Sequence, residues 1–296
     1  MTFEAIPNYS IEHILDTNQG PAHLVAMDLN AYIEKHGLQL APHRHDFYHL
    51  LYFLEARGDH YIDFIHFPVK PHQFYFIMPG QVHQWKFSGD IKGYVINFTE
   101  SFFQSPYFQI QLLEQFSIFN GYCEDQVLNI NESARAEIEI LFKKIIGETQ
   151  TMSAFAIDMI RCHLMQLFIL VSRNTIKEKP VAYSKYDPIL LRNFKKLVNT
   201  RFRQHKLPKE YAQMLHVTPN YLNNVTKEVW GKSSGTVIRE RIILEAQRLL
   251  ANADLTITEI AYQLNFQDNS YFTKFFKKYS GMTPEQFRKK YVIPGV

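Results

Sequence analysis

The sequence has few cysteines and no long apolar run. Only 2 of the 296 residues are cysteine, too few for a disulfide scaffold, which fits a reducing compartment. No stretch reaches the roughly 18 uninterrupted apolar residues of a membrane span, so we expect no membrane partner. The first residues, MTFEAIPNYSIEH, lack the basic start and the apolar core of a secretory signal. We therefore expect a cytoplasmic protein.

The composition is that of a folded chain. Apolar residues make up 46% of it and aromatic residues 15%, whereas only 21% are charged, which excludes a disordered protein. A length of 296 residues corresponds to two domains, at the usual size of about 100–200 residues each. Two prolines and scattered charges in NTIKEKPVAYSKYDP, residues 174–188, predict a linker between them.

Charge is distributed unevenly along the chain. Residues 1–185 carry 14 Lys and Arg against 20 Asp and Glu, a net charge of −6, whereas residues 186–296 carry 18 against 9, a net charge of +9. Because phosphate contacts are made chiefly by Lys and Arg, the second half is predicted to bind a polyanion. Ten of the 13 histidines fall within residues 1–83, so the halves also differ in side-chain chemistry.

The basic half contains an internal repeat. Residues 210–231 align with residues 259–281, at an offset of 49 positions before a turn and 50 after it. Apolar residues recur at helical spacing and strand signals are absent, so one helical unit is present twice. The matched pairs are Glu210 and Glu259, Ala212 and Ala261, Leu215 and Leu264, Val217 and Phe266, Tyr221 and Tyr271, and Gly231 and Gly281.

Each copy has the pattern of a helix-turn-helix. A small Ala in the first helix allows the second helix to cross closely. The turn then ends in a residue that can cap the next helix, Thr218 before Pro219 in the first copy and Asp268 before Asn269 in the second. A glycine follows each second helix, where a left-handed residue is usual.

The second helix of each copy is expected to have a packed face and a polar face. The packed residues would be Tyr221, Leu222 and Val225 in the first copy and Tyr271, Phe272, Phe275 and Phe276 in the second. Amides can bond adenine edges, and lysines can reach guanine or phosphate. One polar helix face usually indicates only exposure to solvent. Two copies of such a face in a segment of net charge +9 indicate DNA binding instead. The candidate DNA-binding residues are Thr218, Asn220, Asn223, Asn224, Lys227, Gln267, Asn269, Ser270, Thr273, Lys274 and Lys277.

Residues from about 190 to 292 resemble the AraC/XylS family of bacterial transcription regulators. The similarity rests on Arg248-Leu249-Leu250 and on TITEIAYQLNFQDNSYFTKFFKKYSGMTPEQFRK at 256–289. The resemblance implies two helix-turn-helix subdomains joined by a long helix at about 234–252. It also implies that these subdomains enter successive major grooves on one face of DNA.

Three positions depart from the family pattern. Asn265 stands where the family usually has Gly, but Asn tolerates the left-handed conformation, so the turn should survive. Thr226 occupies a position normally held by a core Phe, and Asn224 one often held by Arg. The first copy is therefore expected to pack less tightly and to bind bases differently.

The acidic half predicts a small β-barrel. Between residues 20 and 100, short runs alternate apolar and polar residues and are broken by Gly and Pro. Aromatic side chains nearby favour an apolar pocket with a few polar groups, as in small-molecule sites. Strand periodicity places on one inward face the residues His43, His45, Phe47, His49, Leu51 and Phe53.

The same stretch resembles a cupin. His43-x-His45 is followed by His49, where metal-binding cupins usually carry Glu, and Pro79-Gly80-x-x-His83 matches the second cupin motif. Imidazoles at these four positions could hold Zn, Fe or Mn. Because AraC-type sensor barrels commonly keep the His-x-His pair without a metal, we expect no metal and no cofactor. We expect His43, His45, His49, His83 and Phe47 to contact a small-molecule effector.

Two helices are predicted after the barrel, at about 132–148 and 152–173. In the first, an apolar seam has 4-3-4 spacing, and the second is apolar almost all round. The seam either packs against the barrel or joins two copies of the chain, and the family resemblance implies that such a helical pair dimerises. The seam residues are Ala134, Ile138, Leu141 and Ile145.

These observations predict an α+β protein of two domains, a cupin-like β-barrel with a helical connector and an all-α domain with a double helix-turn-helix. The expected boundaries are 1–130 for the barrel, 131–173 for the connector, 174–188 for the linker and 189–296 for the DNA-binding domain, with helix-turn-helix subdomains at about 207–231 and 256–281.

The predicted function is sequence-specific DNA binding for transcription regulation, controlled by an effector in the barrel and without catalysis. The expected partners are double-stranded DNA, a small-molecule effector and a second copy in a homodimer, with RNA polymerase as a further candidate. The alternatives are a cupin-type metal enzyme, a constitutive DNA-binding protein with a collapsed barrel, and a regulator controlled by a protein partner. The sequence does not choose the effector, nor between activation and repression.

Overall fold

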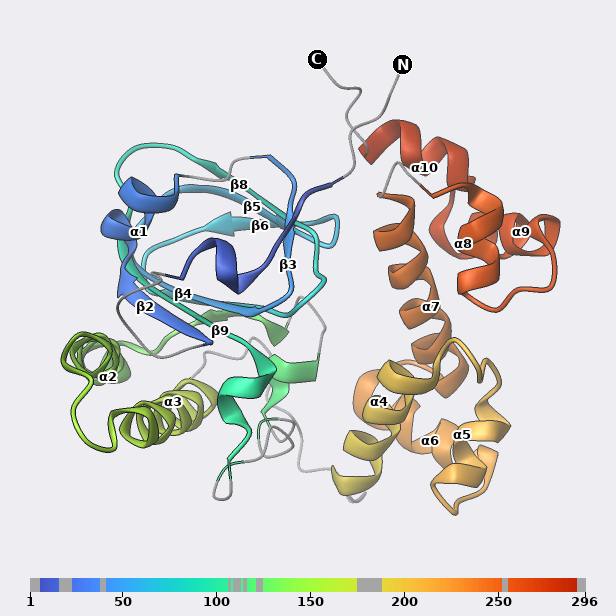
Figure 1. Ribbon diagram of the computed structural model, residues 1–296. Helices are drawn as coiled ribbons and strands as arrows, with labels where there is room; N and C mark the ends of the chain where they lie inside the picture. The colour runs from blue at the N-terminus through green and yellow to red at the C-terminus, as the bar shows by residue number, and fades with distance from the viewer. Residues whose placement is uncertain are drawn as a thin grey trace. The chain divides into compact units, whose positions relative to one another are not determined.

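The protein divides into two compact units (Figure 1). Pro7–Glu178 form the N-terminal unit, and Lys179–Val296 belong to the C-terminal unit. None of the described helices combines the length and the apolar character that a bilayer crossing needs. The computed structural model describes residues 6–15, 23–37, 41–105, 108, 113, 116–120, 125–174, 188–251 and 255–291.

The N-terminal unit is built from β-sheets. The largest has five antiparallel strands in the order β10-β7-β4-β9-β2, a second has the order β6-β5-β8, and β1 pairs with β3. An isolated bridge joins His43 to His83. The strands are β1 (Asn8–Tyr9), β2 (Leu24–Asp28), β3 (Arg44–His45), β4 (Tyr48–Glu55), β5 (Gly58–Ile62), β6 (Ile65–Val69), β7 (Gln73–Ile77), β8 (His83–Phe87), β9 (Lys92–Phe98) and β10 (Val127–Asn129).

Strand β4 is buried on both faces because its alternate side chains enter two different cores. Leu50 and Tyr52 belong to a large core that also contains residues of two long helices. Leu51 and Phe53 belong to a second core, which lies inside the barrel with Trp85. The predicted inward face of this strand is therefore confirmed, and its opposite face is as apolar.

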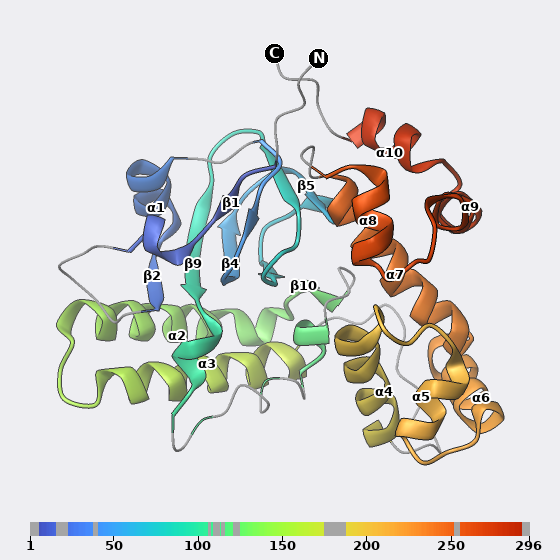
Figure 2. The same cartoon turned by 45° about the vertical axis from the view of Figure 1, so that its right-hand side comes forward.

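The helices α2 (Glu132–Thr151) and α3 (Ala156–Arg173) pack side by side against the large sheet (Figure 2). All four seam residues, Ala134, Ile138, Leu141 and Ile145, are buried in that core, at 0–3% exposure. The seam therefore packs within the chain and is not available to a second copy. Of the two arrangements that the sequence left open for the seam, the structure shows packing against the barrel, since the sheet presents a complementary apolar face.

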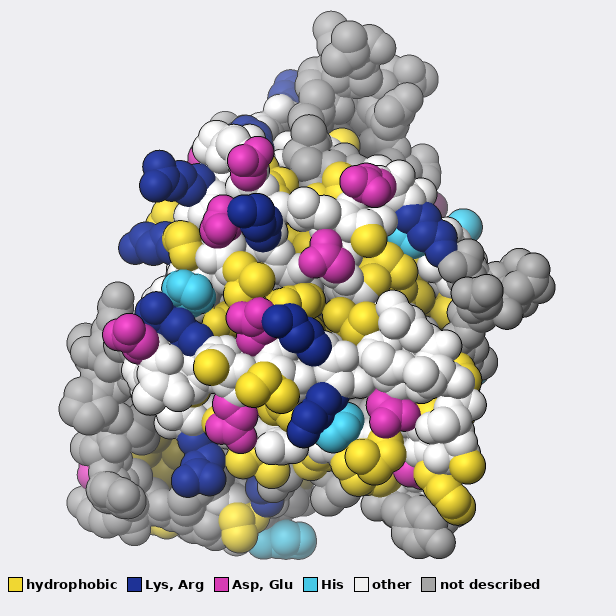
Figure 3. All heavy atoms as spheres, turned by 90° about the vertical axis from the view of Figure 1, so that its left-hand side faces the viewer, with side chains coloured by type: hydrophobic (Ala, Val, Ile, Leu, Met, Phe, Trp, Pro, Cys, Tyr) yellow, Lys and Arg dark blue, Asp and Glu magenta, His cyan; other side chains and the backbone are white. Residues whose placement is uncertain are grey.

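Short helices complete the N-terminal unit. The helix α1 (Leu29–His36) follows β2, and 3-10 turns lie at η1 (Ile11–His13), η2 (Glu100–Phe103) and η4 (Ser117–Asn120). Figure 3 shows the unit from the left-hand side of Figure 1, with basic and acidic side chains interspersed among apolar ones. This face has no large area of one sign of charge.

The described residues of the C-terminal unit form helices joined by turns, with no strand among them. The long helix α7 joins a group formed by α4, α5 and α6 to a group formed by α8, α9 and α10 (Figure 1). The helices are α4 (Pro188–Arg201), α5 (Pro208–Met214), α6 (Pro219–Trp230), α7 (Ser234–Leu250), α8 (Ile257–Gln263), α9 (Asn269–Ser280) and α10 (Pro284–Tyr291).

The turns of the two repeats confirm the local predictions. Gly231 and Gly281 end α6 and α9 with φ of 68° and 84°. Asn265 is left-handed at φ 54°, as expected of a residue in place of Gly, and His216 adopts φ 55° at the matching position of the first copy. The two copies therefore share a left-handed residue in the turn, and in neither copy is this residue a glycine.

Candidate functional site

The helices α6 and α9 each begin at the capping residue that the sequence indicates. The Thr218 hydroxyl accepts a hydrogen bond from the Tyr221 backbone N–H at 3.1 Å, and the Asp268 carboxylate accepts one from the Tyr271 N–H at 2.7 Å. The caps fix where each helix starts, and therefore which side chains occupy its first turns.

Nine of the eleven candidate DNA-binding residues lie on α6 and α9, whereas Thr218 caps α6 and Gln267 lies in the turn before α9. Asn223 and Thr273 are half-buried, and the other nine are exposed. In α9, the Asn269 side-chain Nδ2 lies 3.4 Å from the Thr258 hydroxyl, and the Thr273 hydroxyl lies 3.4 Å from the Asn269 side-chain oxygen Oδ1. These long contacts restrict the Asn269 side chain while leaving it accessible to a ligand.

Two tyrosines expected to pack inward do not. Tyr221 is 42% exposed and Tyr271 is 59% exposed, whereas Leu222 and Phe272 are fully buried. Each tyrosine lies in the first turn of its helix, so its ring extends past the core that the next residue enters. The outer faces of α6 and α9 thus include an exposed aromatic ring that the sequence analysis assigned to the core.

The interiors of the two copies differ as expected. Thr226 is fully buried in α6, and its hydroxyl donates to the Asn223 carbonyl at 3.1 Å. The matching residue of α9 is Phe276, which is fully buried against Phe272 and Phe287. The first copy therefore places a small, locally bonded residue where the second buries an aromatic ring.

A lysine just before the first copy bonds the turn of the second. The Lys206 ammonium donates to the Asn265 carbonyl at 2.8 Å and to the Arg203 carbonyl at 3.0 Å, and it lies 4.9 Å from the Phe266 ring centroid. Desolvation lowers the pKa of Lys206. This contact helps to fix the two copies relative to each other.

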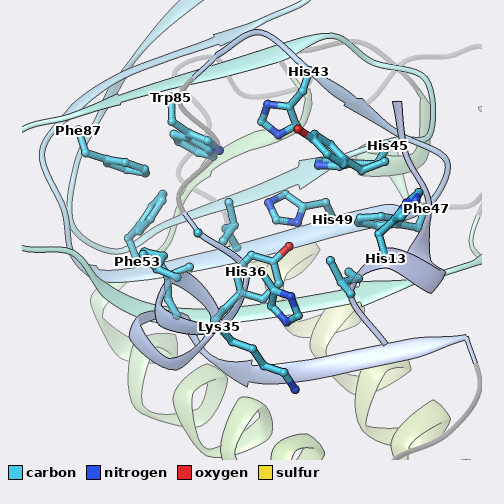
Figure 4. Close-up of a pocket in the computed structure, with 17 residues that line it drawn as sticks. His13, Lys35, His36, His43, His45, Phe47, His49, Phe53, Trp85 and Phe87 are labelled. Carbon is cyan, nitrogen blue, oxygen red and sulfur yellow. The ribbon is translucent and has the colours of Figure 1, made fainter. Parts of the chain in front are cut away.

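The N-terminal unit contains a cavity of about 320 Å³ (Figure 4). It lies between α1, η1, the β3–β4 segment and β8, and most of its lining is apolar or aromatic. Four of the five residues predicted to contact an effector, His43, His45, Phe47 and His49, line the cavity. Other lining residues were not predicted from the sequence: Tyr9, His13, Ile14, Leu29, Tyr32, Ile33, Lys35, His36 and Gly37.

His83 lies behind the cavity lining. Its Nε2 is 3.3 Å from the Nε2 of His45, and its Nδ1 is 3.1 Å from the Nε2 of His60. His60 was not predicted, and its ring stacks on Trp85 with centroids 3.3 Å apart. The pairing of β5 with β8 places His60 opposite Trp85, and the sequence alone does not give that register.

Burial keeps these histidines neutral. It lowers the pKa of His43, holds those of His45, His60 and His83 well below the ordinary value, and lowers the pKa of His49 to about 4. The rings also disfavour one another's protonation because like charges repel. Neutral imidazole is the form that accepts hydrogen bonds and binds metals.

Three of the four candidate metal ligands come together. One ring nitrogen from each of His43, His45 and His83 lies within 4.8 Å of the others. His49 is not in this group, and its Nδ1 is 2.6 Å from the Asn97 side-chain oxygen. The structure thus separates His49, which bonds Asn97, from a group of three.

Comparison with known proteins gives the same division of the chain. A model of the AraC-like ligand binding domain matches residues 31–156, and a helix-turn-helix domain model matches residues 211–290. The chain is 39% identical over 79 residues to the uncharacterized transcriptional regulatory protein YesN of Bacillus subtilis, covering 26% of this chain and 22% of that protein. It is 21% identical over 257 residues to the uncharacterized regulator YfiF of the same organism, covering 84% and 79%.

A third relative is the probable transcription factor PqrA of Proteus vulgaris, 34% identical over 74 residues, which cover 25% of this chain and 61% of PqrA. Among solved structures, the C-terminal domain of AraT, a response regulator from Geobacillus stearothermophilus, is 30% identical, with a TM-score of 0.34 and coverage of 38% of this chain and 92% of that one. The chain thus spans less than two thirds of both YesN and PqrA.

A barrel with a cavity and a domain with two helix-turn-helix copies define a two-domain protein of the helix-turn-helix regulator class. The chain belongs to the AraC family of transcriptional regulators. The family and the fold class predicted from the sequence are confirmed.

Proposed function

We propose that this protein regulates transcription by binding a specific DNA sequence through α6 and α9. The observation that carries the proposal is the pair of capped helices whose exposed faces bear amides and lysines, in a segment of net charge +9. Lys274 and Asn269 on α9 and Asn224 on α6 read base edges, whereas Lys227 and Lys277 contact phosphates.

The cavity of the N-terminal unit holds the effector in this proposal. A volume of about 320 Å³ with aromatic walls and a few imidazoles suits a small organic molecule. It also argues against the alternative of a collapsed barrel. The effector acts by binding one arrangement of the protein more tightly than another, because only differential affinity shifts such an equilibrium.

The proposed regulator is cytoplasmic and acts as a homodimer that contacts RNA polymerase. The seam of α2 is buried in the chain, so a second copy would use the exposed apolar side chains of α2 and α3. These include Ile140, Met159 and Ile169, which are 51%, 42% and 43% exposed. Sedimentation of the full chain measures whether two copies associate.

The DNA proposal is tested by selecting bound sequences from a random duplex library with the full chain. We expect an enriched motif, and we expect Lys274→Ala to change that motif. The matched control is Lys92→Ala, which removes the same charge from the N-terminal unit and should leave the motif unchanged. A library that yields no enriched sequence would overturn the proposal.

The effector proposal has a separate test. A metabolite panel is screened for ligands that raise the Tm of the full chain, since a ligand that binds only the folded state stabilises it. DNA affinity is then measured with and without each such ligand. If every ligand that binds leaves DNA affinity unchanged, the barrel does not control DNA binding.

A further inference from the structure

We infer that the N-terminal unit binds one divalent first-row transition-metal ion through His43, His45 and His83. The three imidazoles come from two parts of the chain, His43 and His45 at β3 and His83 at the start of β8, and the bridge between His43 and His83 brings these parts together. All three side chains are buried, at 1–4% exposure. No metal was expected from the sequence, and the geometry of these rings changes that expectation.

The spacing of two of the nitrogens suits a shared ion. The Nε2 atoms of His45 and His83 are 3.3 Å apart. Two imidazole nitrogens bound to one tetrahedral Zn²⁺ at about 2.0–2.1 Å lie about 3.3 Å from each other. The observed separation therefore already equals that of two ligands in a tetrahedral site.

The protonation of His43 leaves a lone pair available. Its Nδ1 lies 2.8 Å from the Ala41 carbonyl oxygen, which can only accept, so Nδ1 carries the proton. The unprotonated Nε2 is then the ligand atom. A metal-binding histidine typically donates its other N–H to such a carbonyl, which fixes the ring for coordination.

His83 has an outer partner of the same kind. Its Nδ1 lies 3.1 Å from the Nε2 of His60, so His83 can donate from Nδ1 and keep Nε2 for the ion. His60 is in turn held by stacking on Trp85. The Nδ1 of His45 has no hydrogen-bond partner among the described residues. Two of the three ligands are thus oriented by a second group.

The donor set selects the kind of ion. Three neutral imidazoles without a carboxylate suit Zn²⁺, Ni²⁺, Co²⁺ or Fe²⁺, whereas Mg²⁺ and Ca²⁺ prefer oxygen ligands. His43 and His45 line the cavity, which gives an ion a path of entry. Three protein ligands also leave a coordination position for water or another molecule.

The test uses the full chain freed of metal by a chelator and titrated with Zn²⁺ alone. We expect one equivalent to bind, and we expect His45→Ala and His83→Ala to abolish stoichiometric binding. His60→Phe keeps a ring over Trp85 but removes the acceptor for His83, so it should weaken binding about 10–100-fold. The matched control is His66→Ala, which removes an exposed histidine on β6 and should bind one equivalent like the wild type.

Two results would overturn the inference. One is uptake of less than one equivalent by the wild type, and the other is wild-type affinity in both His45→Ala and His83→Ala. If circular dichroism shows that these variants do not fold, the wild type loaded with Co²⁺ decides the question by proton NMR. Three exchangeable imidazole N–H signals shifted by the paramagnetic ion support the site, and fewer than three reject it.

Discussion

The two helix-turn-helix copies share several backbone features and differ in their side chains. Both have a capped second helix, a left-handed residue in the turn and a closing glycine. The copy formed by α8 and α9 buries aromatic rings and presents Lys274, whereas the copy formed by α5 and α6 buries Thr226 and presents Asn224. Turn geometry and helix capping are thus common to both copies, whereas the buried side chains and the exposed side chains differ.

The largest expected difference between the copies lies in their cores. Phe276→Ala should lower the free energy of unfolding of the C-terminal unit by about 3–5 kcal/mol, because it removes a fully buried ring. Thr226→Ala should cost only about 1 kcal/mol, since it removes one local hydrogen bond. Hydrogen exchange of α6, α7 and α9 peptides in urea measures both. Equal losses would show that the two cores are equivalent.

The outer faces should differ in base recognition. Lys274→Ala should cost about 1–3 kcal/mol on the preferred DNA and relax selectivity at one base pair. Asn224→Ala should cost less, because a neutral amide makes a weaker hydrogen bond to a base edge than a charged ammonium does. Affinities for the preferred site and for its single-base substitutions, measured at fixed salt, distinguish the two. A loss from Lys274→Ala that is the same on every sequence would identify Lys274 as a phosphate contact.

The phosphate contacts should instead be alike in the two copies. Lys227→Ala and Lys277→Ala are each expected to weaken binding to all sequences. Each should also reduce the slope of the logarithm of the binding constant against the logarithm of the salt concentration by about one unit. The measurement is DNA affinity across a series of salt concentrations. A variant with an unchanged slope has no contact with phosphate, and that copy would then lie differently on DNA.

The smallest effects are expected in the turns. His216→Gly should raise the free energy of unfolding by roughly 0.5 kcal/mol, because relief of a left-handed His exceeds the added freedom of the unfolded chain. Asn265→Gly should change it less, since Asn tolerates this conformation. Hydrogen exchange of α5 and α8 peptides reads both changes. A loss of stability in His216→Gly would show that the imidazole makes a stabilising contact.

Local chemistry made much of the C-terminal unit predictable. The caps Thr218 and Asp268, the closing glycines and the left-handed Asn265 depend on a few neighbouring residues, so their pattern can be read from the sequence. The prediction that Tyr221 and Tyr271 are buried was wrong. Helical periodicity gives the direction of a side chain around the helix axis, but not how far the neighbouring helix extends along it. That extent depends on tertiary packing.

In the N-terminal unit, strand periodicity gave the inward face of His45, Phe47 and His49, since alternation is a local property. The direction of the α2 seam was left open by the sequence and was decided by the apolar outer face of the sheet. His60 could not be assigned, because its role depends on the register between β5 and β8.

The sequence by itself determined the family, the division into an acidic and a basic half, and the doubled helix-turn-helix, because composition, local turn chemistry and repetition are written along the chain. Only the tertiary structure decided which histidines meet. A bridge pairs His43 with His83 across 40 residues and so brings His83 to His45, whereas His49 lies outside this group and bonds Asn97. Contacts between distant segments depend on strand register and packing, which no local pattern specifies.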